Sequence, residues 1–139
     1  MSEAKVRAGR QEDIPAILEL WRGADAPPTV TDNEAALRAV LDRDPESILV
    51  AHIDDELVGS VIAAWDGWRG NMYRLAVHPD YRRQGIAALL VAEGEKHLRE
   101  LGCRRVTALV LTNEPGAKQL WASVGYEKQP EMARFRKNL

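Results

Sequence analysis

The stretch "VHPDYRRQGIAALLV", residues 77–91, joins the end of an apolar, strand-like run to a run of helix formers, with Arg82, Arg83, Gln84 and Gly85 between them. A helix N-terminus presents unpaired backbone N–H groups and a partial positive charge, which is why phosphates bind there. Gly85 would let a phosphate approach the backbone closely, and the two arginines would add positive charge. The stretch therefore predicts a phosphate site, with a solvated strand-to-helix turn as the alternative.

The same stretch excludes two familiar nucleotide motifs. No Gly-Lys-Ser/Thr follows, so the turn is not a P-loop, and the three-glycine spacing of dinucleotide-binding turns is missing. Ligands of open α/β sheets bind beyond the carboxyl ends of strands, which is where this loop would lie.

Hydrophobic periodicity extends the fold in both directions. Strands at 71–77 and 104–111 enclose a helix at 85–101, and such a unit makes a right-handed parallel crossover. Two apolar runs, 47–53 and 57–65, indicate an antiparallel hairpin. The remaining elements expected from the pattern are a strand at 5–9, helices at 11–22, 31–44 and 115–124, and two short last strands at 126–128 and 132–138.

These elements predict a single domain over residues 1–139. Its class is α/β (α+β), with a mixed, mostly antiparallel central sheet of six to seven strands flanked by four helices. Thr31 and Glu34 have capping-box spacing, which starts the second helix at Thr31. Gly102 is expected to end the helix at 85–101, and His97 on that helix is expected to face solvent.

The composition narrows the functional classes. Apolar residues make up 45% and charged residues 29% of the 139, which is typical of a globular chain, and the net charge of −2 provides no basic field for nucleic acid. Cys103 is the only cysteine, and three scattered histidines show no metal-ligand spacing. No apolar run approaches a membrane span or a signal core. We expect a cytoplasmic protein without a metal, membrane or nucleic-acid partner.

Longer motifs point to a family. The segment "YRLAVHPDYRRQGIAALLVAEGEKHLRELGCRRVTALVLTNEPGAKQLWASVGYE", residues 73–127, strongly resembles the GCN5-related N-acetyltransferases (GNAT), and "VRAGRQEDIPAILELW", residues 6–21, looks like their usual opening. The run from Arg82 to Ala87 matches their acetyl-CoA pyrophosphate loop. The block "DGWRGNMYRLAVHPDYRRQGIA", residues 66–87, resembles in particular the small bacterial YpeA-type members.

The resemblance implies a GNAT fold in which the parallel pair of strands splays apart and acetyl-CoA inserts into the gap. Free backbone groups at the end of the strand 71–77 would bond the pantetheine amides, from Leu75, Ala76 and Val77. Backbone N–H groups and two side-chain charges would hold the pyrophosphate, from Arg82, Arg83, Gln84, Gly85, Ile86 and Ala87. Asn113 would contact the pantetheine or the product, and Trp121 would lie near the thiol.

The implied reaction is the direct attack of an amine, from a small molecule or a peptide, on the acetyl thioester. The backbone N–H of Val77 would stabilise the oxyanion. Many members protonate the leaving thiolate with a tyrosine, but the matching position here is Trp121, and an indole cannot act as an acid. Tyr73, Tyr126 or water would have to replace it, so the catalytic acid stays open.

Three further points stay open at the level of sequence. Asp25 and Asp32, between the first two helices, would lie near the acceptor by family analogy, either as cation-binding groups or as ordinary loop acids. A homodimer is common in the family, and an edge strand near the C-terminus would be its natural contact. Because Trp121 replaces the tyrosine, an acyl-CoA-binding sensor with little turnover is the alternative function.

Overall fold

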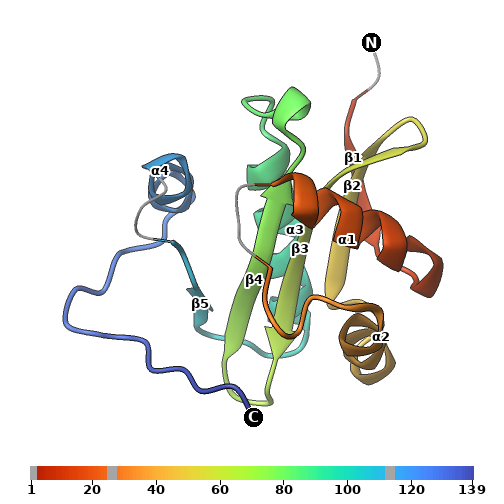
Figure 1. The fold of residues 1–139 in the computed structure, drawn as a ribbon. Coiled ribbons are helices and arrows are strands. Elements are labelled where there is room, and N and C mark those ends of the chain that lie inside the picture. The colour runs from red at the N-terminus through yellow and green to blue at the C-terminus, as the bar shows by residue number, and fades with distance from the viewer. Residues whose placement is uncertain (1–2, 25–27, 112–114) are drawn as a thin grey trace. The chain divides into compact units, whose positions relative to one another are not determined.

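The apolar runs around the opening stretch form one mixed sheet, flanked by helices (Figure 1). The computed structural model describes residues 3–24, 28–111 and 115–139. The chain divides into two compact units, Met1–Leu109 and Val110–Leu139.

The first unit contains all the strands. In chain order its elements are β1 (Lys5–Ala8), a 3-10 turn (Gln11–Asp13), α1 (Ile14–Gly23), α2 (Glu34–Arg43), β2 (Ile48–Ile53), β3 (Glu56–Trp65), β4 (Gly70–Val77), a second 3-10 turn (Pro79–Tyr81), α3 (Ile86–Glu100) and β5 (Val106–Ala108). The five strands lie in the order β1-β2-β3-β4-β5, and every neighbouring pair is antiparallel except β4 and β5. The predicted mixed, mostly antiparallel sheet with one parallel pair is confirmed.

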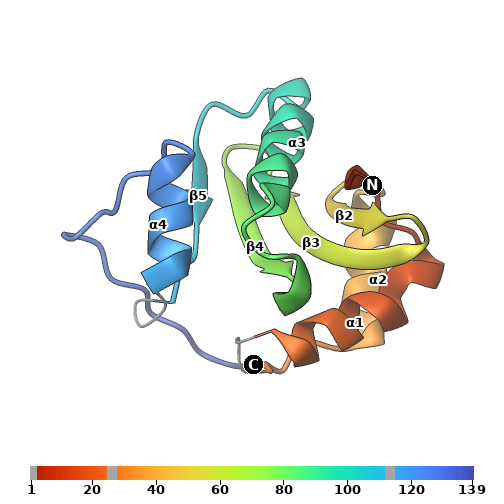
Figure 2. The same cartoon turned by 90° about the horizontal axis from the view of Figure 1, so that it is seen from above.

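Helices cover both faces of this sheet (Figure 2). On one face α1 and α2 bury their apolar stripes against β2 and β3, in a cluster that includes Ile14, Ile17, Leu37, Ile48, Val50 and Ile62. On the other face α3 packs against β3 and β4. A Cβ placed on Gly94 of α3 would lie 2.8 Å from the terminal methyl group of Met72, so the Met72 side chain faces α3. Full burial of such a side chain contributes about 1.5–3 kcal/mol.

The predicted number of strands is wrong. Residues 126–128 and 132–138 form no strand, and the described residues of the second unit contain one helix, α4 (Pro115–Ser123). Most side chains after Gly125 are exposed, including Phe135 at 95%, so they offer no buried face on which a strand could pack. β5 is also shorter than the predicted strand at 104–111. The sheet therefore has five strands instead of six to seven, and the described residues of the second unit add no edge strand to it.

The start of α2 also differs from the prediction. Asn33 is the N-cap, and its side-chain oxygen accepts a hydrogen bond from the backbone N–H of Ala36 at 2.9 Å. The Thr31 hydroxyl instead lies 3.2 Å from that of Thr29. Glu34 is therefore the first helical residue and cannot occupy the third position that a capping box requires.

His97 is buried, contrary to the prediction. Its ring is 9% exposed, and its Nε2 lies 2.8 Å from a carboxylate oxygen of Asp44, the residue after α2. This partner lies 53 residues away, so the local sequence around the histidine gives no sign of it.

Replacing Asn33 by alanine should lower the free energy of unfolding by about 1 kcal/mol, because the Ala36 N–H loses its acceptor. Thr31→Ala is the matched control, with an expected change below about 0.5 kcal/mol. Urea denaturation of the two variants and the parent protein measures both values. A larger loss for Thr31→Ala would mean that α2 begins where the sequence alone places it.

Candidate active site

The pairing between β4 and β5 stops halfway along β4. The parallel register runs from Gly70 opposite Val106 to Met72 opposite Ala108, but β4 continues to Val77. Figure 1 shows β5 beside only the lower part of β4. Beyond Met72, this edge of β4 has no strand beside it in the described part of the first unit.

A bulge in β4 lies where this pairing ends. Against β3, Ile62 pairs with Tyr73 and Ser60 pairs with Ala76, so Arg74 and Leu75 together stand opposite Val61. Arg74 has a left-handed backbone with φ of 54°. An inserted residue of this kind bends a strand and changes the direction of the groups that follow it.

The bulge determines which backbone groups point to the open edge. Residues of a strand direct their N–H and C=O alternately to its two edges. Gly70 donates its N–H to Arg105 before β5, whereas His78, eight residues later, donates its N–H to Val58 of β3 at 2.8 Å. An even separation in a regular strand would put both bonds on the same edge. After the bulge, therefore, the N–H and C=O of Val77 point to the edge that β5 has left.

The loop after β4 is held by three side-chain contacts. His78 Nδ1 accepts the backbone N–H of Asp80, and Arg82 Nε donates to the Val77 carbonyl at 3.3 Å. The Tyr81 hydroxyl donates to a Glu56 carboxylate oxygen at 2.7 Å, and this bond raises the pKa of Tyr81 above its usual value. The contacts tie the loop to the end of β4 and to the hairpin between β2 and β3.

The loop leads into the N-terminus of α3, where two residues have a left-handed backbone. Gly85 is the N-cap of α3, with φ of 79°, and Arg83 also has a positive φ of 64°. The first backbone bond of the helix runs from the Leu89 N–H to the Gly85 carbonyl, so the N–H groups of residues 86–88 precede the helical ladder. Residues 82–85 are all exposed. The predicted features of an anion site, a glycine, two arginines and leading N–H groups, therefore occur together.

Tyr73 and Arg74 are neighbours in β4, but the first is partly exposed and the second is held in an ion pair. Tyr73, a candidate acid, is 37% exposed and pairs with Ile62 of β3. Arg74, which the sequence analysis did not select, forms an ion pair with Asp32, and its Nε lies 3.2 Å from the Asp32 carboxylate. A charged residue inside an otherwise apolar strand was the signal that could have found it. Asp32 is thus paired and is not an isolated loop acid.

The second unit brings together two of the predicted residues. Trp121 of α4 is 7% exposed, and its ring packs edge-to-face on Tyr126 with centroids 4.8 Å apart. The Tyr126 N–H donates to the Trp121 carbonyl at 2.9 Å. Asn113 and Asp25, both named from the sequence, lie outside the described residues.

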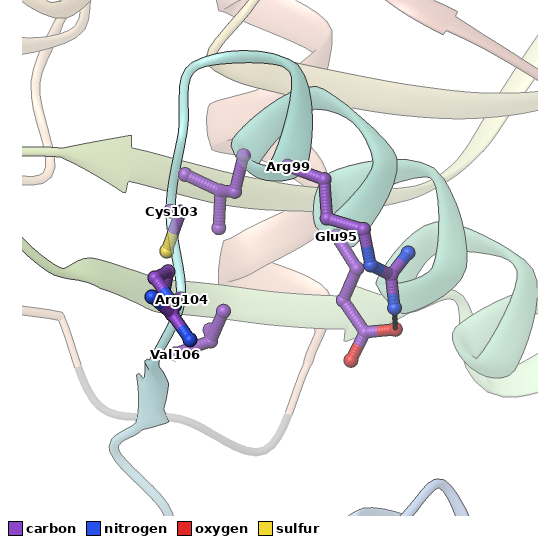
Figure 3. A pocket seen from close by; sticks show the side chains of 6 residues that line it. Glu95, Arg99, Cys103, Arg104 and Val106 are labelled. Atoms are coloured by element: carbon purple, nitrogen blue, oxygen red, sulfur yellow. Dashed lines mark ion pairs between the residues drawn. The ribbon is translucent and has the colours of Figure 1, made fainter.

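A small hollow elsewhere in the first unit does not resemble a substrate site. It has a volume of about 130 Å³ and lies at the C-terminal end of α3, where Glu95 and Arg99 form an ion pair at 3.8 Å beside Cys103 (Figure 3). Small-molecule sites usually have about 300–1,000 Å³. Across the 15 residues of α3, this end lies about 20 Å from Gly85.

Two other site classes find no support in the described ranges. No three His, Cys, Asp or Glu side chains there gather as metal ligands. None of the helices described has the length and apolar character needed to cross a bilayer.

Comparisons with known proteins agree with this arrangement. Residues 14–126 match the model of the acetyltransferase (GNAT) family. An acetyltransferase from Pectobacterium atrosepticum is 36% identical over 123 residues, which cover 88% of this chain and 87% of the relative.

Two solved structures share the fold. One is a PaiA N-acetyltransferase from Thermoplasma acidophilum in complex with coenzyme A, with a TM-score of 0.81, 16% identity and 91% of each chain covered. The other is AAC(6')-Iy in complex with a bisubstrate analogue, with a TM-score of 0.81, 17% identity, and 99% of this chain and 100% of that chain covered. With a family model that spans most of its residues and a bacterial relative along nearly its whole length, the chain belongs to the GNAT family of acetyltransferases.

Proposed function

We propose that this acetyltransferase transfers the acetyl group of acetyl-CoA to a primary amine and binds the donor along the open edge of β4 and the N-terminus of α3. One observation carries the proposal. β4 loses its neighbour β5 after Met72 and leads, within one short loop, to the glycine-capped start of α3. A pantetheine chain needs backbone partners, and a pyrophosphate needs N–H groups and positive charge. Both requirements are met on consecutive segments.

Each part of the donor has its own residues in this proposal. Leu75 and Val77, on the open edge, bond the pantetheine amides, and the N–H groups from Arg83 to Ala87 bind the pyrophosphate. Ala76, which the sequence also named, pairs with Ser60 of β3, so its backbone groups point away from the open edge and have no such role. Arg82 and Arg83 do not contribute equally. Because the Arg82 side chain donates to the Val77 carbonyl, it also holds the loop against the strand, whereas Arg83 contributes mainly charge.

The transfer requires a neutral amine. Acetyl-CoA supplies an activated thioester carbonyl; a C–N bond forms, the C–S bond breaks, and the proton lost by the nitrogen is balanced by one gained by the thiolate. At pH 7, deprotonation costs about 4.6 kcal/mol for a lysine and about 1 kcal/mol for an α-amino group. The Val77 N–H, which points to the open edge, donates to the carbonyl oxygen as negative charge develops on it.

The proton for the leaving thiolate comes from a phenol in this proposal. Trp121 cannot supply it, but Tyr126 packs directly against Trp121 and carries a phenol hydroxyl, which can act as an acid. Tyr73, exposed on β4, is the second candidate. The acceptor class, small amine or protein amine, depends on loops outside these residues. A sensor of acyl-CoA with little turnover is the alternative that Trp121 favours.

Gly85→Ala should weaken acetyl-CoA binding by about tenfold or more, measured by calorimetric titration. A Cβ at Gly85 meets no protein atom within 4 Å, so its effect falls on the ligand and on the left-handed backbone. Gly102→Ala is the matched control, because Gly102 ends the same helix with φ of 97° and equally open space. Both variants should lose about 1–2 kcal/mol of stability. Equal affinities for the two variants would contradict the phosphate site.

Thiol release from acetyl-CoA in the presence of amine panels separates the enzyme from the sensor. The panels contain small polyamines, peptides with a free α-amino group and lysine peptides. We expect amine-dependent release, and a Tyr126→Phe variant should lower kcat by about 100-fold. Tyr73→Phe, which removes the same hydroxyl from β4, should retain the rate. If binding is tight but no amine stimulates release, the sensor replaces the enzyme.

A further inference from the structure

The bulge in β4 changes the face of the sheet on which the following side chains lie, and side chains on the α1 side contact it. Met72 faces α3, whereas Ala76, four residues later, packs against the core under α1 and α2. In a regular strand two residues four apart share a face. After the inserted residue, therefore, each side chain lies on the opposite face of the sheet, and each backbone N–H and C=O points to the opposite edge, compared with a regular strand. Arg74 lies where this change occurs.

Arg74 lies on the α1 side of the sheet, over Trp21. Its guanidinium carbon is 5.2 Å from the centre of the Trp21 ring, within the range of a cation–π interaction. Without the bulge it would share the face of Met72 and point toward α3. The Trp21 ring is itself fixed, because its Nε1 donates to the buried Ser60 hydroxyl at 2.9 Å, and Ser60 pairs with Ala76 just after the bulge.

Asp32 completes the support from the segment before α2. Its carboxylate pairs with Arg74 and also accepts the Thr29 backbone N–H at 2.8 Å. The two side chains of the ion pair are only 17% and 11% exposed. A partly buried pair of this kind is screened less than a surface pair, so its removal has a larger effect.

We infer that Arg74 is a positioning residue: held by Asp32 and Trp21, it keeps the β4 bulge formed and so keeps the Val77 N–H directed at the open edge. The left-handed backbone at Arg74 is unfavourable for a residue with a side chain and persists only where its surroundings impose it. The ion pair supplies that constraint. The inference rests on the proposed function only for its effect on acetyl-CoA, since the bulge itself is a property of the free protein.

Three variants separate this role from a direct contact with the ligand. Asp32→Asn removes one charge of the pair. Arg74→Val removes the pair and also disfavours positive φ, whereas Arg74→Gly removes the pair but accepts positive φ readily. Both Arg74 variants are made together with Asp32→Asn, so that the Asp32 carboxylate is not left charged without its partner. If Arg74 acts through the bulge, the glycine double variant should bind acetyl-CoA about tenfold more tightly than the valine double variant.

Asp13→Asn is the control for the loss of an ion pair in general. Asp13 pairs at 2.7 Å with Arg7 of β1, which lies three strands from β4 in the sheet, and the two side chains are 13% and 33% exposed. Asp13→Asn should lower the melting temperature and leave acetyl-CoA affinity within about twofold of the parent. Equal affinities of the glycine and valine double variants would overturn the inference, because a directly contacting arginine would be missed equally in both.

A second readout does not depend on the ligand. Backbone chemical shifts of residue 74 in the free protein distinguish a left-handed from an extended conformation. They should remain left-handed in the parent and the glycine double variant and become extended in the valine double variant. If the valine double variant keeps the left-handed shifts, the inference fails, whatever acetyl-CoA does. If the parent binds no acetyl-CoA but the shifts change as expected, the proposed function fails and the support of the bulge stands.

Discussion

The extra residue in β4 is the constraint on which the rest of the candidate site depends. Without it, Val77 would direct its backbone groups to β3. The edge beside β5 would then present the backbone groups of Ala76 and His78. With it, the strand turns an N–H and a carbonyl to an edge that β5 has left, at the point where the chain enters the loop toward α3. The same insertion moves Arg74 to the α1 face, where Trp21 and Asp32 hold it. One local irregularity thus couples the sheet edge, the first helix and the segment before α2.

The second element of the site is electrostatic and local. The chain has a net charge of −2, so no long-range field attracts an anion. In the proposed function, attraction comes from the turn before α3, where two exposed arginines precede a helix whose first N–H groups lie before the helical ladder. The loop is kept in place by the Tyr81 bond to Glu56 and the Arg82 bond to the Val77 carbonyl. The charge and the backbone geometry that we propose for pyrophosphate binding therefore both come from neighbouring residues of one short segment.

The parts of this structure that follow from sequence are those set by local pattern. The helix after Gly85, the hairpin of β2 and β3, and the crossover from β4 to β5 each have periodicity or a glycine that marks them. The parts that do not follow depend on distant partners. His97 meets Asp44 from 53 residues away, and Arg74 meets Asp32 from 42 residues away. Residues 126–128 and 132–138 show the converse: their local sequence predicts two short strands, but they form none and no strand pairs with them.

In the proposed function, the Val77 N–H and the leading N–H groups of α3 face the acetyl donor. Amide hydrogen exchange of the parent protein, with and without acetyl-CoA, measures this directly at single residues. We expect protection to rise at Val77 and at residues 86–88, while the amides that join β1 to β2 are unchanged. Binding without added protection at these amides would contradict it, because the donor would then lie elsewhere on the molecule.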